Sequence, residues 1–175
     1  MVSDTHYLAD KDDPSKLDAS SAENNGRLVE QLNKLPGTEI LERAGGGTVR
    51  KPAFVIHGGD VIDTGDKSGK VQSEMQRTEM AAFEKTMGLT GTDGGLAYPV
   101  YEIHGNHDGP GGKGHAIDRI IERNKKRPGV KHVSPNGLHY SWDAGDVHFV
   151  NVGIVVGSVP GIARRRRYAP MDSLD

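Results

Sequence analysis

The sequence contains no cysteine, and this absence excludes disulfide bonds and thiolate metal sites. Any bound metal ion must therefore be held by His, Asp, Glu, Asn or backbone oxygen. Long hydrophobic runs are also missing, since no apolar stretch approaches the roughly 18 residues that a membrane span needs. No signal peptide is visible at the start of the sequence.

A strong excess of charge of one sign is absent as well. The formal net charge of −2 gives no general attraction to nucleic acid or to an anionic membrane surface, so we expect neither as a partner. A chain of 175 residues is long enough for one domain with a real core and short for two. We therefore expect a single domain over 1–175, and the sequence does not indicate its oligomeric state.

Apolar periodicity and turn residues predict alternating strands and helices. We expect helices from a cap at Ser20 or Ser21 to about Leu35, over 72–87 with Gly88 as the stop, and over 115–126. Strands are expected over 53–57, 98–103, 138–142 and 147–152, with a turn at 144–146 and an extension over 154–156. This order favours an α/β layered domain with a largely parallel sheet, in which ligands bind beyond the carboxyl ends of the strands.

Groups that bind metal ions follow the ends of several predicted strands. A short first strand, with only Met1 and Val2 as apolar residues, leads to Asp4-x-His6. The strand over 53–57 is followed by Gly-Asp60-x-x-Asp63, and the strand over 98–103 by Gly-Asn106-His107-Asp108. Parallel strands bring such loops to one edge of a sheet, where carboxylate, imidazole and amide ligands can share divalent cations.

These segments, "SDTH", "GGDVIDTG" and "HGNHD", together resemble the calcineurin-like metallophosphoesterase family. Each motif alone is weak, but the ordered set, with each motif ending an apolar strand, is specific. The resemblance extends from Ser3 to about Val156 and includes the "LHYSWDAGDVHFVNV" hairpin. It implies a layered metallophosphoesterase-type sandwich with largely parallel strands and flanking helices.

The resemblance also implies an activity, namely hydrolysis of a phosphomonoester or phosphodiester by a hydroxide that bridges two divalent metal ions (Mn, Fe or Zn). By residue match, Asp4 and His6 bind the first ion, Asp60 bridges both ions and Asn106 binds the second. His107 would stabilise the phosphate or donate a proton to the leaving oxygen. Asp108 would orient the His107 ring.

The family pattern continues with a single His and a G-H-x-H motif, and nothing after Val156 matches either. Together with the short first strand and the helix-like segment 170–175, this leads us to expect a fragment that lacks its C-terminal part. A degenerate or truncated metal-binding domain without turnover is therefore the alternative function. The compartment stays open, with a preference for the cytoplasm and with loss of a signal peptide as the other possibility.

Several conspicuous residues have simpler interpretations. We expect Asp63 to form hydrogen bonds rather than bind metal, and His57 and His104 to be satisfied by neighbouring groups in or near the core. Four arginines at 164–167 are interpreted as a solvated loop, with steering of anions as the alternative. Met75, Met80 and Met87 are expected to pack in the core.

Substrate identity cannot be read from the sequence. The substrate pocket would be built from the loops at 9–18, 64–71 and 109–114, and none of these carries a recognition signature. The glycine-rich loop at 109–114 lacks the spacing of a P-loop, so we do not expect it to hold a phosphate in that way.

Overall fold

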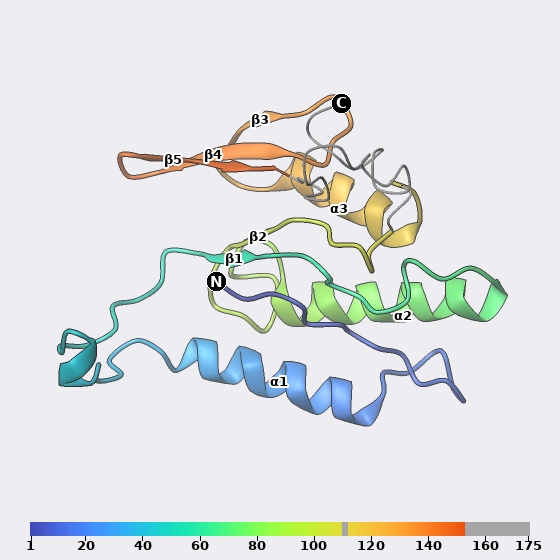
Figure 1. Ribbon diagram of the computed structural model, residues 1–175, viewed down its shortest axis with the longest axis horizontal. Helices are drawn as coiled ribbons and strands as arrows, with labels where there is room; N and C mark the ends of the chain where they lie inside the picture. Colours follow the sequence, from blue (N-terminus) through green and yellow to red (C-terminus); the bar gives the residue numbers. More distant parts are fainter. Residues whose placement is uncertain (110–111, 153–175) are drawn as a thin grey trace, which may run out of the picture.

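The computed structural model describes residues 1–109 and 112–152 (Figure 1). Its helices are α1 (Ala19–Asn33), the short 3-10 helix η1 (Glu42–Ala44), α2 (Lys70–Met87) and α3 (His115–Lys126). Its strands are β1 (Val55–His57), β2 (Val100–Glu102), β3 (Val130–Val133), β4 (Tyr140–Ala144) and β5 (Val147–Asn151). None of the helices in the described ranges is long and apolar enough to cross a membrane.

The helices lie close to the predicted ranges, but the start of α1 differs. Its N-cap is Asp18, whose carboxylate accepts a hydrogen bond from the Ser21 amide at 2.9 Å. The Ser21 hydroxyl does not cap the helix, because it accepts a hydrogen bond from the Leu8 amide at 3.0 Å instead. Ser21 thereby attaches the N-terminal segment to α1. Gly88 follows the last residue of α2, as the sequence predicts.

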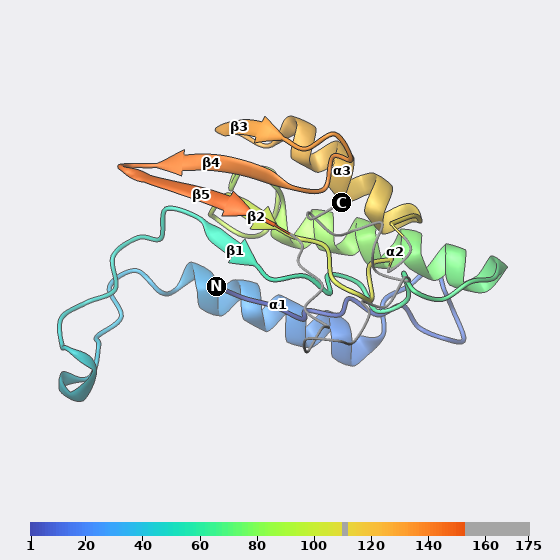
Figure 2. The same cartoon turned by 45° about the horizontal axis from the view of Figure 1, so that its top comes forward.

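Two sheets form the middle and upper layers of the molecule (Figures 1 and 2). Strands β1 and β2 pair in parallel, with Ile56 opposite Tyr101. The N-terminal segment adds two isolated parallel bridges, Val2 to His57 and Tyr7 to Ile62, where a short first strand was expected. The other sheet is antiparallel with the order β3-β4-β5, and its β3 strand was not predicted.

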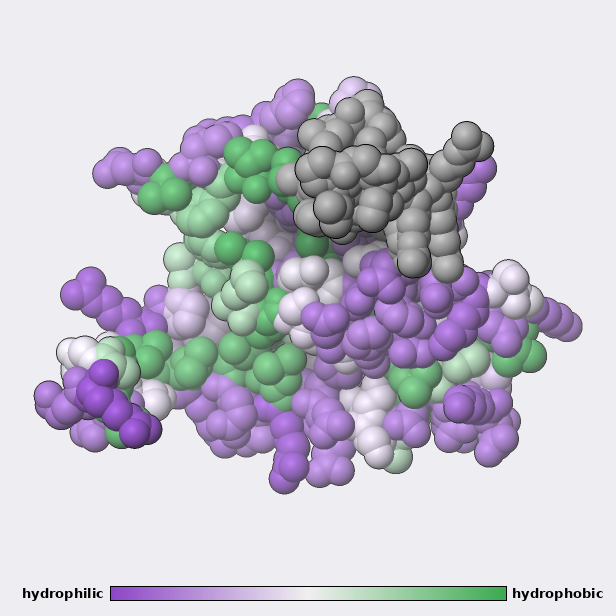
Figure 3. All heavy atoms as spheres, viewed as in Figure 1, coloured by the Kyte–Doolittle hydropathy of each residue, from purple (hydrophilic) through white to green (hydrophobic). Residues whose placement is uncertain are grey.

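Hydrophobic residues hold these layers together from both faces of the β1–β2 pair. One face packs against the helices in a core that includes Val55, Val100, Phe83 and Ile120. The other face contributes Tyr101 to an aromatic cluster in which its ring stacks on Trp142 at 4.1 Å between ring centroids. Hydrophilic residues cover the outer side of α1, whereas hydrophobic residues gather between α1 and the β3–β5 sheet (Figure 3). The α/β layered fold expected from the sequence is confirmed.

A buried ion cluster attaches α3 to the end of β2. The Glu102 carboxylate is fully buried and lies 2.7 Å from Arg123 Nε and 2.6 Å from Arg127 Nη2. Burial opposes the charge of Glu102, but the two guanidinium groups outweigh it and hold the pKa of this carboxyl well below its usual range. Because Glu102 directly precedes the segment 103–108, the cluster fixes the position from which that loop leaves the sheet.

Some expectations lie outside the described residues. These are the strand extension over 154–156, the arginine run at 164–167 and the helix-like segment 170–175. The glycine-rich loop at 109–114 is described apart from residues 110 and 111. Met75, Met80 and Met87 are buried, as expected for core residues.

Candidate metal centre

The N-terminal segment and the loop after β1 run side by side at the carboxyl end of the β1–β2 pair. The Asp4 amide donates to the Gly59 carbonyl at 3.0 Å, and the His6 amide donates to the Asp60 carbonyl at 3.1 Å. The loop after β2 joins them, because the His107 amide donates to Asp60 Oδ1 at 2.7 Å. Hydrogen bonds from three backbone amides, two to carbonyls and one to the Asp60 carboxylate, thus bring all three motif-bearing segments to one place.

Two glycines allow this close approach. A Cβ atom on Gly105 would lie 2.2 Å from the Asp60 backbone nitrogen, and one on Gly59 would lie 2.8 Å from the Gly105 nitrogen. Both distances are shorter than side chains tolerate, so any larger residue would push the loops apart. Gly59 also has a φ angle of +98°, which favours glycine.

Three potential ligands converge at this edge, Asp4, His6 and Asp60. Each offers an oxygen or ring nitrogen, and these atoms all lie within 4.8 Å of one another. The Nε2 atom of His6 is 3.9 Å from Asp4 Oδ1. Two carboxylates and an imidazole facing a common space form a donor set that suits Mn²⁺, Fe²⁺ or Zn²⁺.

The backbone at these residues is unusual. Asp4, His6 and Asp60 have φ angles of +56°, +40° and +51°, and they are the non-glycine residues with positive φ in the described ranges. This left-handed conformation costs roughly 1–2 kcal/mol for a residue with a side chain. Such costs cluster at functional sites, where the surrounding structure maintains them.

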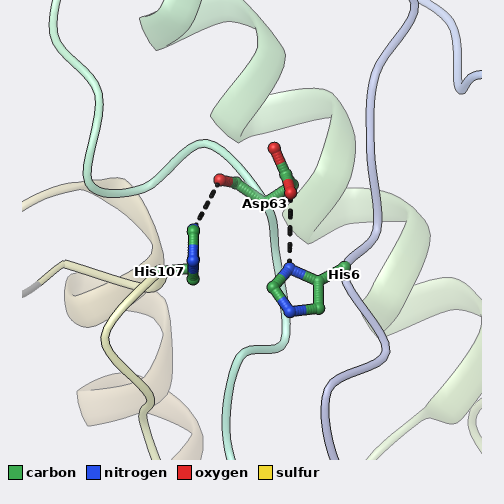
Figure 4. Close-up of side chains that lie close together, drawn as sticks. All are labelled: His6, Asp63 and His107. Atoms are coloured by element: carbon green, nitrogen blue, oxygen red, sulfur yellow. Dashed lines mark hydrogen bonds and ion pairs between the residues drawn. The ribbon is translucent and has the colours of Figure 1, made fainter.

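Asp63 connects His6 with His107 (Figure 4). Its Oδ1 atom lies 3.3 Å from His6 Nδ1, and its backbone carbonyl lies 3.3 Å from His107 Nδ1. The two rings meet edge to face, with 4.9 Å between their centroids. His6 therefore has Nδ1 beside the Asp63 carboxylate and Nε2 on the side of Asp4.

The Asp63 carboxylate has a second partner, Lys67, whose Nζ atom lies 2.7 Å from Oδ2. Burial alone would raise the pKa of Asp63, but the hydrogen bond and charge of Lys67 outweigh burial and lower it. Asp63 thus carries a negative charge beside His6 at neutral pH. The atoms of His6, Asp63 and His107 also lie within 4.8 Å of one another, which gives a second group able to hold a cation.

Asn106 and His107 follow β2, as the sequence indicates, and they differ in exposure. Asn106 is exposed, whereas His107 is partly buried, with Nδ1 3.6 Å from Asp66 Oδ1. The structure gives no contact that places the Asn106 amide among the ligands of the other described segments. Its role as a ligand therefore stays a prediction.

Asp108 occupies a different position from the one expected. Its carboxylate is fully buried and accepts hydrogen bonds from the amides of Val61, Ile62 and Gly105 at 3.2, 3.0 and 2.7 Å. Burial raises its pKa to about 6, against the effect of these hydrogen bonds. Among the described contacts, Asp63 and Asp66 face the His107 ring, and Asp108 instead fastens the loop after β2 to the loop after β1. The expected orienting contact was wrong because the chain turns at 105–108 and directs this side chain inward.

His57 supports the candidate metal centre through contacts of both of its ring nitrogens. Its ring is buried, accepts a hydrogen bond from the Gly59 amide at Nδ1 (3.2 Å) and lies 2.9 Å from the Thr5 hydroxyl at Nε2. Burial lowers its pKa to about 4, so the ring is neutral at pH 7. His57 links the residue between Asp4 and His6 to the second motif, in agreement with the expectation of a satisfied histidine.

Glu79 on α2 is a supporting residue that the sequence analysis missed. Its carboxylate is fully buried and accepts hydrogen bonds from the Ala9 amide at 3.0 Å and from the Thr64 amide and hydroxyl at 3.1 and 2.8 Å. Burial raises its pKa, although these hydrogen bonds oppose the shift. The sequence did contain a signal for a buried role of Glu79. This residue lies four positions from both Met75 and Phe83, so it falls on the apolar face of the helix.

A family model described as calcineurin-like phosphoesterase matches residues 1–171 of this sequence. The chain belongs to the calcineurin-like phosphoesterase family. This is a hydrolase family whose proteins typically bind divalent metal ions. The His and Asp groups described above could hold such ions. Comparisons with curated proteins and with solved structures found no significant match.

Proposed function

We propose that this phosphoesterase-family chain hydrolyses a phosphomonoester or phosphodiester with two divalent metal ions (Mn, Fe or Zn). The observation that supports this most strongly is the convergence of Asp4, His6 and Asp60 within 4.8 Å, on backbone whose φ angles are positive. Asp4, His6 and Asp60 would hold the first ion, and Asp60 and Asn106 would hold the second. The bound ions would supply an activated water and neutralise charge on the phosphoryl oxygens.

In this proposal the residues of the chain position ligands and move a proton. The Asp63 carboxylate lies beside Nδ1 of His6, and Nε2 of the same ring faces the Asp4 carboxylate. The backbone amide of His107 holds Asp60 Oδ1, which fixes the carboxylate that both ions would share. Substrate binding and discrimination between monoesters and diesters would fall to the loops around this edge.

His107 is the proposed group for proton transfer. The Asp63 carbonyl and the Asp66 carboxylate both lie on its Nδ1 side, at 3.3 and 3.6 Å. These oxygens favour a proton on Nδ1, and Nε2 is then the ring atom that can exchange a proton with the substrate. A histidine in this position contributes to phosphate hydrolysis by stabilising the phosphoryl oxygens or by protonating the leaving oxygen.

The test combines metal binding with turnover. Calorimetric titration with Mn²⁺ is expected to show binding, and 4-nitrophenyl phosphate or bis(4-nitrophenyl) phosphate is expected to be hydrolysed only when metal is present. The His107→Asn variant should keep the ion held by Asp4, His6 and Asp60 and lose about 100-fold or more in kcat, as removal of a proton-transfer group does. Metal binding with no turnover of either ester would favour the alternative, a non-catalytic metal-binding domain.

A further inference from the structure

A hollow of about 400 Å³ lies beside the candidate metal centre. Its lining includes Leu8, Lys11, Asp63, Lys67, Val71 and Met75. Asp63 is common to the hollow and to the metal centre, because one carboxylate oxygen faces His6 and the other faces Lys67. A molecule held at the metal centre could therefore extend into the hollow past Asp63.

The wall of the hollow is held in a fixed shape by buried side chains of α2. Thr64 lines the hollow, and its amide and hydroxyl donate to Glu79. The Gln76 amide group donates to the carbonyls of Thr64 and Lys67, at 2.9 Å in each case. Such a wall is already formed before a ligand arrives, which reduces the entropy lost on binding.

The chemistry of the lining combines apolar surface with positive charge. Leu8, Val71 and Met75 supply apolar side chains, and the Val71 side chain on α2 is 47% exposed. Lys67 already pairs with Asp63, whereas Lys11 forms no ion pair with any residue in the described ranges. An apolar group that carries a negative charge on its far side would match both features.

We propose that this hollow receives the organic part of the phosphoester, and that it selects an apolar or aromatic group bearing a second anionic group, which Lys11 meets. The proposal rests on the proposed phosphoester hydrolysis and adds its substrate class. Leu8, Val71 and Met75 contact the apolar part, and the phosphate stays at the edge defined by Asp4, His6 and Asp60.

The test compares phenyl phosphate with 4-carboxyphenyl phosphate, using Mn²⁺-loaded protein. The carboxylate also changes the reactivity of the ester itself, so the quantity compared among variants is the ratio of the two kcat/KM values. In Lys11→Glu this ratio is expected to fall by about two- to fivefold, the range that a solvent-exposed ion pair supports. Lys125→Glu makes the same charge change on the exposed side of α3 and should leave the ratio as in the wild type.

A binding measurement separates this proposal from the proposed function. Titration of the metal-free protein with 4-hydroxybenzoate, followed by NMR, is expected to shift the methyl signals of Leu8, Val71 and Met75, and Lys11→Glu should weaken the shifts. If neither ester is hydrolysed while these shifts occur, the proposed function fails and the hollow is supported. If the esters are hydrolysed but Lys11→Glu leaves the ratio unchanged, or if the shifts are absent, the proposal for the hollow is overturned.

Discussion

The Nδ1 atom of His6 lies 3.3 Å from the Oδ1 atom of Asp63, on the side of the ring away from Asp4. A carboxylate beside Nδ1 of a histidine favours the ring orientation in which Nε2 is free to bind a cation. Asp63 can thus support the candidate metal centre through His6, and the expectation that it is not itself a ligand stays a prediction.

Replacing Asp63 by Asn is expected to weaken metal binding about 10- to 100-fold, which is the usual effect of removing a carboxylate behind a metal-binding histidine. The side chain keeps its shape and loses its charge, so the fold should persist. Calorimetric titration with Mn²⁺ or Zn²⁺ measures the effect. Asp118→Asn, at an exposed position on α3, is the matched control. Unchanged affinity in Asp63→Asn would show that His6 does not depend on this contact.

Asp60→Asn is expected to be the most damaging single change to metal content, because a carboxylate shared by two ions serves both. The Asn oxygen can still accept the hydrogen bond that the His107 amide now gives to Asp60 Oδ1, so the loops should stay together. The metal content of Asp60→Asn is compared with that of Asp4→Asn by elemental analysis after dialysis. If Asp4→Asn loses as much metal as Asp60→Asn, the shared role of Asp60 is wrong.

Glu79→Gln should destabilise the chain by about 1–3 kcal/mol, the cost of leaving a buried polar group without a partner. Both carboxylate oxygens of Glu79 accept hydrogen bonds, and an amide nitrogen cannot replace either of them. Urea unfolding measures the loss, and Glu74→Gln on the exposed side of the same helix is the control. Equal stability of the two variants would mean that the loops at Ala9 and Thr64 do not depend on Glu79.

His57 should make stability depend on pH. Its pKa is lowered from 6.5 to about 4 in the folded chain, so the unfolded chain binds the extra proton as the pH falls below 6.5. The resulting loss of stability develops between about pH 6.5 and pH 4 and reaches about 3 kcal/mol at most.

Asp108 acts in the opposite direction over part of this range. Its pKa is raised from 3.8 to about 6, so its contribution is present at low pH and is lost as the pH rises through 6. The wild type alone would therefore show a small net effect. The informative quantity is the stability difference between wild type and His57→Gln, which should shrink as the pH falls from 7.5 to 4.5. A difference that is constant with pH would contradict a buried neutral ring at position 57.

The sequence predicted the helices well because their signals are local. Met80, Phe83 and Met87 lie at helical spacing, and Gly88 stands where α2 ends. Strand β3 was missed because only Val130 and Val133 are apolar in it, and the two residues between them are exposed. The cap of α1 was misplaced because Ser21 binds Leu8, a partner 13 positions away that no local pattern reveals.

The same difference between local signals and long-range contacts applies to the candidate site. The motifs indicated that Asp4, His6 and Asp60 meet, because strand ends in a parallel sheet share one edge. The direction of each side chain depends on the turn that carries it, and for this reason the inward position of Asp108 was not foreseen. Contacts from distant elements, such as that of Glu79 with Ala9 and Thr64, depend on tertiary packing, which a single sequence shows only as a charge on an apolar helix face.

The left-handed backbone at Asp4, His6 and Asp60 places stability and chemistry in direct competition at the same three positions. Glycine adopts such conformations without steric cost, but it offers no carboxylate or imidazole. Selection for a stable fold alone would therefore favour other residues here, and the structure retains the costly ones. Where a lineage of such proteins loses its metal ions, substitution of Asp4 or His6 would bring a gain in stability, whereas Asp60 would still be retained by the hydrogen bond from the His107 amide.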